Sequence, residues 1–230
     1  MKTIGLIGGM SWESTVPYYQ VINRQVMEQL GGLHSAKIIL YSFDFHEIEH
    51  LQHAGEWEKA GQKLADAAYC LQQGGADFIV ICTNTMHKVA GTVEGRVSIP
   101  LLHIADPTAE AIRAAGHSKV GLLGTRFTME QPFYRDRLVR NHGIDVVVPS
   151  QGDREIVHRI IYEELCKGTV LNGSREEYRR IMRSLADDGA EAIILGCTEI
   201  SLLVDQSDSP VPVFDTTHIH AQAAARIAIR

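Results

Sequence analysis

The chain has 230 residues, 45% of them hydrophobic, and a formal net charge of -6 at pH 7. The hydrophobic content suffices for a packed core, and an acidic chain without a run of Lys or Arg argues against nucleic-acid and anionic-membrane partners. No stretch approaches the roughly 18 apolar residues of a membrane span, and no secretory signal pattern opens the chain. We therefore expect a cytoplasmic protein with no nucleic-acid or membrane partner.

Short apolar, β-branched runs predict four strands in each half of the chain. In chain order they are 3–7, 37–41, 78–82, 99–102, 120–123, 145–148, 192–195 and 211–214. Most are continuous rather than alternating, and amphipathic stretches separate many of them. This pattern indicates buried parallel sheets covered by helices, the α/β class.

Amphipathic periodicity and end signals predict the helices. The clearest are 14–30, 56–73, 129–141, 154–167, 174–187 and 217–229. Ser174 with Glu177 forms a capping-box pattern, Gly74 and Gly143 suit helix C-termini, and Asp106-Pro107 is typical of a helix start.

The chain contains an internal repeat. Residues 75–85 align without gaps with residues 189–199, which places Thr83 opposite Cys197. Residues 2–9 resemble 119–125, and 99–102 resemble 211–214, in the same order. We predict two pseudo-symmetric α/β/α sandwich halves with parallel four-stranded sheets, at 1–115 and 116–230. The C-terminal segment could pack on the first half.

Ligands of open parallel sheets bind beyond the carboxyl ends of the strands. Here those ends carry small or hydroxyl-rich turns, at 8–11, 82–85, 124–125 and 196–199. Such turns offer free backbone N–H groups that can hold a carboxylate. The alternative is that each simply makes a tight turn or a cap. Their occurrence in matched pairs favours a site.

Cys197 is the sharpest single candidate, because it lies in a predicted strand-to-helix turn where a helix N-terminus can lower a thiol's pKa. The alternative is an inert buried cysteine, which suits Cys70, Cys82 and Cys166 well. The four cysteines show no Cys-x-x-Cys spacing, so neither a zinc site nor a redox pair is predicted.

Cofactor signals are weak. The glycines after the first strand do not match the dinucleotide fingerprint, and there is no phosphate-binding loop motif. The group of His46, His50 and His53 is better explained by a solvated helix start than by a metal site. His218 is a weak candidate for the site. We predict no cofactor and no metal.

Four motifs together resemble the aspartate/glutamate racemase family over the whole chain. They are Gly8-Gly9-Met10, Thr83-Asn84-Thr85-x-His87, Leu123-Gly124-Thr125 and Gly196-Cys197-Thr198-Glu199. The turn at 10–15 is similar to the enterobacterial broad-specificity branch. The resemblance implies a cofactor-independent amino-acid racemase, a homodimer, in which two thiols act on opposite faces of a small amino-acid substrate.

The sequence departs from the family pattern at Thr83, where the resemblance implies the first catalytic cysteine. A threonine hydroxyl can return a proton but is a poor base, so Cys197 is expected to act on the L-enantiomer and Thr83 to limit the reaction. Because enantiomers have equal free energies in achiral solvent, kcat/KM must match in both directions, and Thr83 slows both.

The resemblance also implies the substrate contacts. Asn84, Thr85, Thr125 and Thr198 would hold the carboxylate and ammonium groups. The pocket lining would comprise Met10, Ser11 and Trp12.

Two further positions concern the substrate side chain. Lys167 resembles a position that can meet a distal carboxylate, or it is an ordinary helix-end cation. Gln52 replaces an arginine typical of acidic-substrate members, which argues against strict aspartate specificity; alternatively it is a surface residue without substrate contact.

Two other functions remain open. One is a single-cysteine decarboxylase or isomerase of the same fold, and the other is a non-catalytic binder of amino or carboxylic acids.

Overall fold

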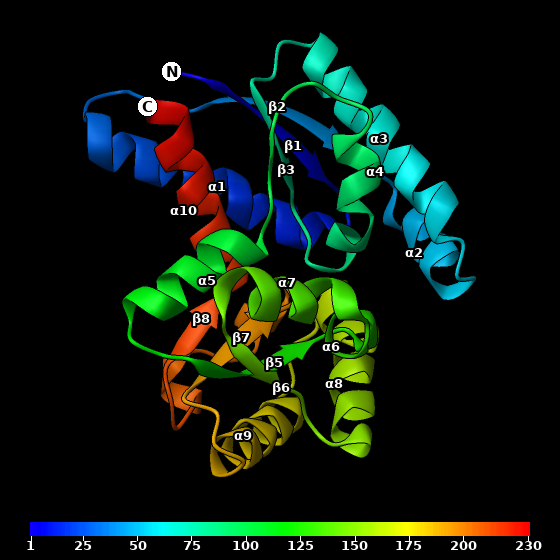
Figure 1. Ribbon diagram of the computed structural model, residues 1–230, viewed down its shortest axis with the longest axis vertical. Coiled ribbons are helices and arrows are strands. Elements are labelled where there is room, and N and C mark those ends of the chain that lie inside the picture. The colour runs from blue at the N-terminus through cyan, green and yellow to red at the C-terminus, as the bar shows by residue number, and fades with distance from the viewer. The chain divides into compact units, whose positions relative to one another are not determined.

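The computed structural model describes residues 1–230 and contains two compact units (Figure 1). Unit 1 comprises Met1–Ile104 and His220–Arg230, and unit 2 comprises Ala105–Ile219. The chain thus changes unit at residue 104 and again inside its last helix, whereas the sequence pattern placed the half-boundary at residue 115. No helix combines the length and apolarity needed to cross a bilayer.

Unit 1 is built on a parallel sheet with the order β2-β1-β3-β4. The strands are β1 (Thr3–Gly8), β2 (Lys37–Ser42), β3 (Phe78–Ile81) and β4 (Leu101–Leu102). The helices are α1 (Trp12–Leu30), α2 (Phe45–His53), α3 (Trp57–Gln73), the 3₁₀ helix η1 (Thr85–Val89) and α4 (Ala90–Glu94). The last helix, α10 (Thr216–Ile229), ends in this unit.

Strands β1 and β3 of this sheet are buried on both faces, to which successive strand residues point in turn. On one face Ile4 and Leu6 pack with Tyr18 and Ile22 of α1 and with the alanines of α10. On the other face, the buried cluster includes side chains of β1, β3, α3 and η1. Two-sided burial explains the continuous apolar runs of these strands.

Unit 2 repeats this plan with the sheet order β6-β5-β7-β8. The strands are β5 (Lys119–Gly124), β6 (Asp145–Val147), β7 (Ala192–Gly196) and β8 (Val213–Asp215). The helices are α5 (Ala105–Ala114), α6 (Arg126–Glu130), α7 (Pro132–His142), α8 (Gln151–Glu163) and α9 (Asn172–Asp187), with 3₁₀ helices η2 (Leu165–Lys167), η3 (Ile200–Leu202) and η4 (Gln206–Asp208).

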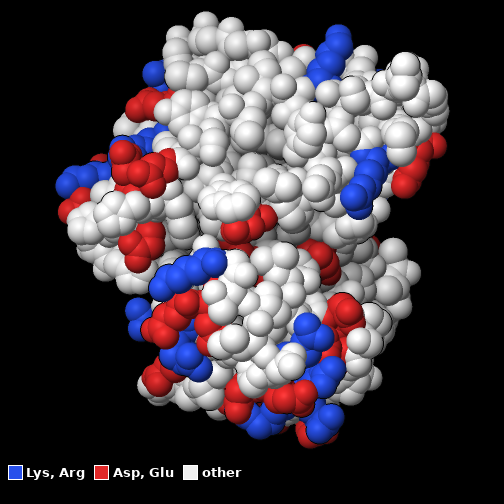
Figure 2. Space-filling view, turned by 180° about the vertical axis from the view of Figure 1, so that it is seen from behind, with Lys and Arg blue, Asp and Glu red and all other residues white.

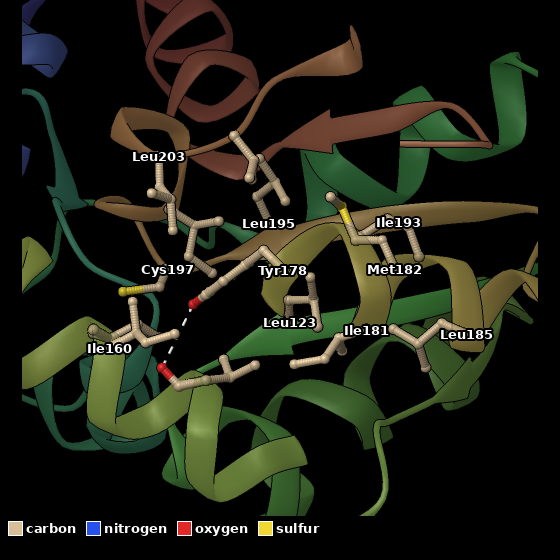
Figure 3. Packing of buried hydrophobic residues seen from close by; sticks show 14 of the residues in the cluster. Leu123, Ile160, Tyr178, Ile181, Met182, Leu185, Ile193, Leu195, Cys197 and Leu203 are labelled. Atoms are coloured by element: carbon tan, nitrogen blue, oxygen red, sulfur yellow. Dashed lines mark hydrogen bonds between the residues drawn. The ribbon is translucent and has the colours of Figure 1, made fainter. Parts of the chain in front are cut away.

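The core of unit 2 places α8 and α9 on one face of the sheet. Tyr178 of α9 is fully buried there and donates a hydrogen bond of 3.5 Å to the carbonyl oxygen of Val157. Figure 3 shows this packing, with Cys197 at the margin of the cluster and its sulfur pointing away from Leu195. The hydrophobic core of unit 2 therefore ends at the turn that contains Cys197.

The predicted fold class and the repeat are confirmed by strand register. Gly5 pairs with Ile79 in unit 1, and Gly121 pairs with Ile193 in unit 2. Glycine recurs at this position because a residue without a Cβ leaves room for the neighbouring helix. A Cβ at Gly121 would lie 3.2 Å from the Cβ of Leu185. Equivalent strands thus end at equivalent turns.

Several predicted helix ends were wrong. The helix predicted at 129–141 is two helices, since Pro132 disfavours a helical conformation at Gln131, whose ψ is 148°. Ser174 does not cap α9, which begins at Asn172; it donates instead to Glu164 at 2.5 Å.

Two glycines that follow helices adopt positive φ angles. Gly143 takes the left-handed conformation predicted for a helix end, with φ of 66°. After α3 this role falls to Gly75, with φ of 94°, rather than to Gly74.

Candidate active site

The turn after β1 is fixed by glycine and by the first turn of α1. Gly9 has a φ of 80°, and a Cβ there would collide with the carbonyl oxygen of Phe43. Its N–H donates to the Thr15 hydroxyl at 2.8 Å, and that hydroxyl donates to the carbonyl oxygen of Ser11. Met10 and Ser11 are buried by this arrangement. Trp12, the first residue of α1, is 63% exposed.

The turn after β3 carries three of the predicted site residues. Thr83, Asn84 and Thr85 are all buried, and Thr83 is 9% exposed. The 3₁₀ helix η1 begins at Thr85 and continues into α4 at Ala90. Cys82 points into the opposite core, where burial raises the pKa of its thiol well above the usual range. Cys82 precedes Thr83 by one residue, and its side chain therefore points away from the turn.

His87 holds this turn in place. The backbone N–H of Ile104 donates to its Nε2 at 3.1 Å, so Nδ1 carries the proton and donates to the carbonyl oxygen of Thr83 at 2.8 Å. His87 is 3% exposed. A neutral imidazole donor thus positions Thr83 through its backbone, a role that the motif pattern alone did not predict.

The turn after β7 carries a thiol and a carboxyl group side by side. The Sγ of Cys197 donates to Oε2 of Glu199 at 3.0 Å, and the Thr198 hydroxyl donates to the same oxygen at 2.7 Å. All three side chains are buried. The thiol and the carboxyl group are thus joined by a direct hydrogen bond inside a buried turn.

A lowered pKa of Cys197 at a helix N-terminus was one of the two alternatives that the sequence left open, and the structure does not support it. Burial, followed by the charge of Glu199, raises the pKa of the thiol well above its ordinary value. The physical reason lies in the turn itself. The 3₁₀ helix η3 that follows has three residues and offers no long helix dipole, whereas Glu199 places negative charge beside the sulfur.

Sequence reasoning assigned no role to Glu199, although this residue lay within a recognised motif. Cys166, which was interpreted as inert, interacts with Glu199. Glu199 raises the pKa of Cys166 by its charge and by a hydrogen bond, after burial as the larger cause. The signal that could have identified Glu199 is its spacing of two residues from Cys197 in a turn.

The remaining predicted residues lie in different settings. Thr125 caps α6 by accepting from the N–H of Thr128 at 3.3 Å, and its turn adjoins the Cys197 turn through the pairing of Gly124 with Gly196. Lys167 is exposed at the end of η2, one residue after Cys166.

Gln52 corrects an expectation. It lies in α2 and is 3% exposed, so the alternative of a surface glutamine does not hold. Its Nε2 contacts Sδ of Met86 at 3.1 Å, which joins it to the segment that follows Thr85. Within unit 1, therefore, Gln52 and the β3 turn belong to one buried neighbourhood that also includes Met10.

The chain matches the family model for Asp/Glu/hydantoin racemases over residues 7–224. The chain belongs to this racemase family. It is 23% identical to the broad specificity amino-acid racemase RacX of Bacillus subtilis, over 93% of this chain and 92% of RacX.

Two solved structures extend the likeness to the whole chain. A crystal structure of a candidate Asp/Glu racemase from Yersinia pestis has 61% identity and a TM-score of 0.93, covering 100% of both chains. An aspartate racemase homologue from Pyrococcus horikoshii has 38% identity and a TM-score of 0.85, again covering both chains completely. The predicted family and fold are thereby confirmed, and family membership supports an isomerase that acts on small amino acids.

The chain positions no group of three metal-binding side chains of the His, Cys, Asp or Glu type. His53 of α2 instead contacts Glu49 at 3.0 Å through Nδ1. Its exposed setting agrees with the solvated helix that the sequence favoured.

Proposed function

We propose that this racemase-family chain is a cytoplasmic, homodimeric, cofactor-independent amino-acid racemase of broad specificity. Cys197 and Thr83 would act on opposite faces of the substrate's α-carbon. The observation that carries the proposal is the hydrogen bond from Cys197 to Glu199 at 3.0 Å, in a buried turn at the end of a sheet strand. The internal repeat supports Thr83 as the matching position.

The raised pKa of Cys197 means that the resting residue is a thiol. To act on L-substrate, the thiol would first pass its proton to Glu199. The thiolate would then take the α-proton, which leaves an enolate on the substrate, and re-form the thiol. Glu199 thus supplies the base that burial denies to Cys197.

Inversion would end with proton donation from the Thr83 hydroxyl to the opposite face of the α-carbon. The proton held by Glu199 and the proton lost by Thr83 would then re-equilibrate with water. Because an alkoxide is costly, this half of the reaction should be slower than deprotonation by Cys197. L-substrate would therefore return to L several times before it inverts.

The substrate's polar groups would be held by the turn side chains. Thr198 donates to Glu199, so its oxygen remains able to accept from the ammonium group. Asn84 and Thr85 would donate to the carboxylate, and Thr125 and Lys167 would complete the binding set. Met10, Ser11 and Trp12 would line the pocket.

Specificity would be set in part by Gln52, whose neutral and buried amide admits polar or uncharged side chains. The name of the Bacillus subtilis relative supports a broad range of amino acids.

The decisive experiment is proton NMR in D₂O with separate L- and D-amino acids, combined with chiral analysis of the product. We expect loss of the L-substrate α-proton to outrun inversion. Enzyme dialysed after hydroxylamine treatment, which removes aldehyde cofactors, should retain the full rate.

Other outcomes would overturn the proposal. Carbon dioxide release from a malonate, without amino-acid exchange, would identify a decarboxylase. Thermal stabilisation by amino acids without any α-proton exchange would identify a binding protein.

A further inference from the structure

The carboxyl group of Glu199 would have to release a proton to water in the proposed reaction, yet this side chain is only 3% exposed. Its Oε2 accepts hydrogen bonds from Cys197 at 3.0 Å and from Thr198 at 2.7 Å. Both donors are buried as well, with 8% and 4% of their surface exposed. Neither of them therefore offers the proton a route to solvent.

Cys166 makes a further contact with Glu199. Its thiol is hydrogen-bonded to the Glu199 carboxyl group. The Cys166 side chain also packs against the buried cluster that contains Cys197. Folding thus brings two cysteines from distant parts of the sequence to one carboxyl group.

Cys166 lies at the boundary between the core of unit 2 and solvent. The 3₁₀ helix η2 runs from Leu165, which is fully buried, to Lys167, which is exposed, and Cys166 between them is half-buried. Figure 2 shows that charged side chains of both signs cover much of unit 2, and a surface of this kind is well hydrated. Among Cys166, Cys197 and Thr198, Cys166 is thus the side chain closest to water.

A thiol in this place can pass a proton on. Burial raises the pKa of Cys166 well above the usual range, so the residue keeps its proton at neutral pH. Its sulfur is also a weak acceptor. The protonated carboxyl group of Glu199 can therefore give its proton to the sulfur while the original thiol proton passes to water. The O–H bond of Glu199 breaks, one S–H bond replaces another, and the carboxylate is restored.

We propose that Cys166 carries protons between solvent and Glu199, and that it acts on the substrate only through Glu199 and Cys197. Cys166 is therefore a positioning residue, which holds an exchangeable proton beside the two groups that perform the chemistry. The inference rests on the proposed function and adds the route by which the proton of Glu199 reaches water.

Hydrogen exchange in D₂O, combined with chiral analysis, separates this role from a structural one. Without the carrier, the proton that Cys197 removes stays within the Cys197–Glu199 pair and returns to the same α-carbon. We expect Cys166→Ala to lower α-proton exchange of L-substrate by about tenfold. Inversion should change by less than about twofold, because the Thr83 step limits it.

Three further variants complete the test. Cys166→Val also lacks an exchangeable proton but nearly keeps the side-chain volume, so it should behave like Cys166→Ala even where the smaller side chain disturbs folding. Cys166→Ser keeps a group that donates and accepts, and its ratio of exchange to inversion should exceed that of Cys166→Ala. The exposed Cys70 of α3 provides the matched control, since Cys70→Ala should leave the ratio unchanged.

An unchanged ratio of exchange to inversion in Cys166→Ala and Cys166→Val would overturn the inference. An equal fall of both rates, which a purely structural role predicts, would do the same, as would equal ratios in Cys166→Ser and Cys166→Ala. The proposed function would survive these results, because the unmodified protein would still exchange and invert its substrate. Absence of exchange in the unmodified protein would instead refute the proposed function, and the role of Cys166 with it.

Discussion

The turns after β3 and β7 occupy equivalent places in two copies of one fold, yet their chemistry differs. The β7 turn carries a thiol hydrogen-bonded to a carboxyl group, Cys197 to Glu199, whereas the β3 turn presents Thr83 and Thr85 at the same positions. Both turns are buried and both lead into a 3₁₀ helix. The backbone plan is therefore repeated in the two units, whereas the hydrogen-bonded thiol and carboxyl group occur in the β7 turn and not in the β3 turn.

The way each turn is supported also differs. In unit 1, His87 fixes the backbone of Thr83 and leaves the hydroxyl uncommitted by that contact. In unit 2, the close approach of strands requires a glycine. A Cβ at Gly196 would lie 2.8 Å from the carbonyl oxygen of Leu123, whereas its counterpart in the repeat is Cys82. Under the proposed function, the β7 turn would remove the α-proton and the β3 turn would supply a proton donor of low acidity.

The largest expected effect comes from Cys197→Ala. If the β7 turn holds the only effective base, α-proton exchange should fall by about 10²–10⁴-fold with both enantiomers. NMR in D₂O measures this directly. The exposed Cys70 of α3 provides the control, since Cys70→Ala should retain the full rate. Residual exchange above a tenth of the original rate would show that the two turns are more alike in chemistry than proposed.

Glu199→Gln is expected to lower exchange by about 10²-fold while preserving the shape of the turn. The pH profile separates catalysis from structure. If the thiol passes its proton to Glu199, as proposed, exchange should vary little between neutral and mildly alkaline pH. In the variant the thiolate must form by loss of the proton to water. Because the Cys197 pKa is raised by burial, exchange should then rise with pH. A flat variant profile would contradict the role of Glu199.

Thr83→Cys should have the opposite effect on the rate of racemisation. A thiol at this position returns a proton more readily than a hydroxyl, so racemisation should rise by about tenfold. The ratio of L-substrate exchange to inversion should fall at the same time. Thr83→Ser is the control that keeps a hydroxyl. Unchanged or lower racemisation in a folded Thr83→Cys variant would count against a catalytic role for this residue.

The smallest expected effect concerns stability at alkaline pH. Burial raises the pKa of Cys82 above its value of about 8.5 in the unfolded chain. The folded state therefore binds this proton more tightly, and the associated stability is complete below pH 8.5 and declines above it.

Thermal unfolding between pH 8 and 10 measures that decline. It should be shallower in Cys82→Ala, although this variant starts from a lower midpoint because it loses buried volume. An equally steep decline would assign the effect to other groups.

Much of the architecture could be predicted from local pattern. Continuous apolar runs indicated two-sided burial. The repeated segments, which occur in the same order in both halves, identified equivalent strands, and β-pairing at Gly5 and Gly121 confirmed them. Helix ends were less predictable. Ser174 has the residue type of a cap, yet it donates to Glu164, ten residues earlier in the chain. Hydrogen-bond competition of this kind depends on what folding brings close.

The sequence by itself determined the duplication, the family and the identity of the two turns, because these depend on residue order and periodicity. Only the tertiary structure decided the state of Cys197, since the pKa of a thiol depends on what surrounds it. Burial and the adjacent Glu199 outweigh the short helix that follows. The same holds for Gln52, which the sequence left open as a surface residue and which folding buries against Met86.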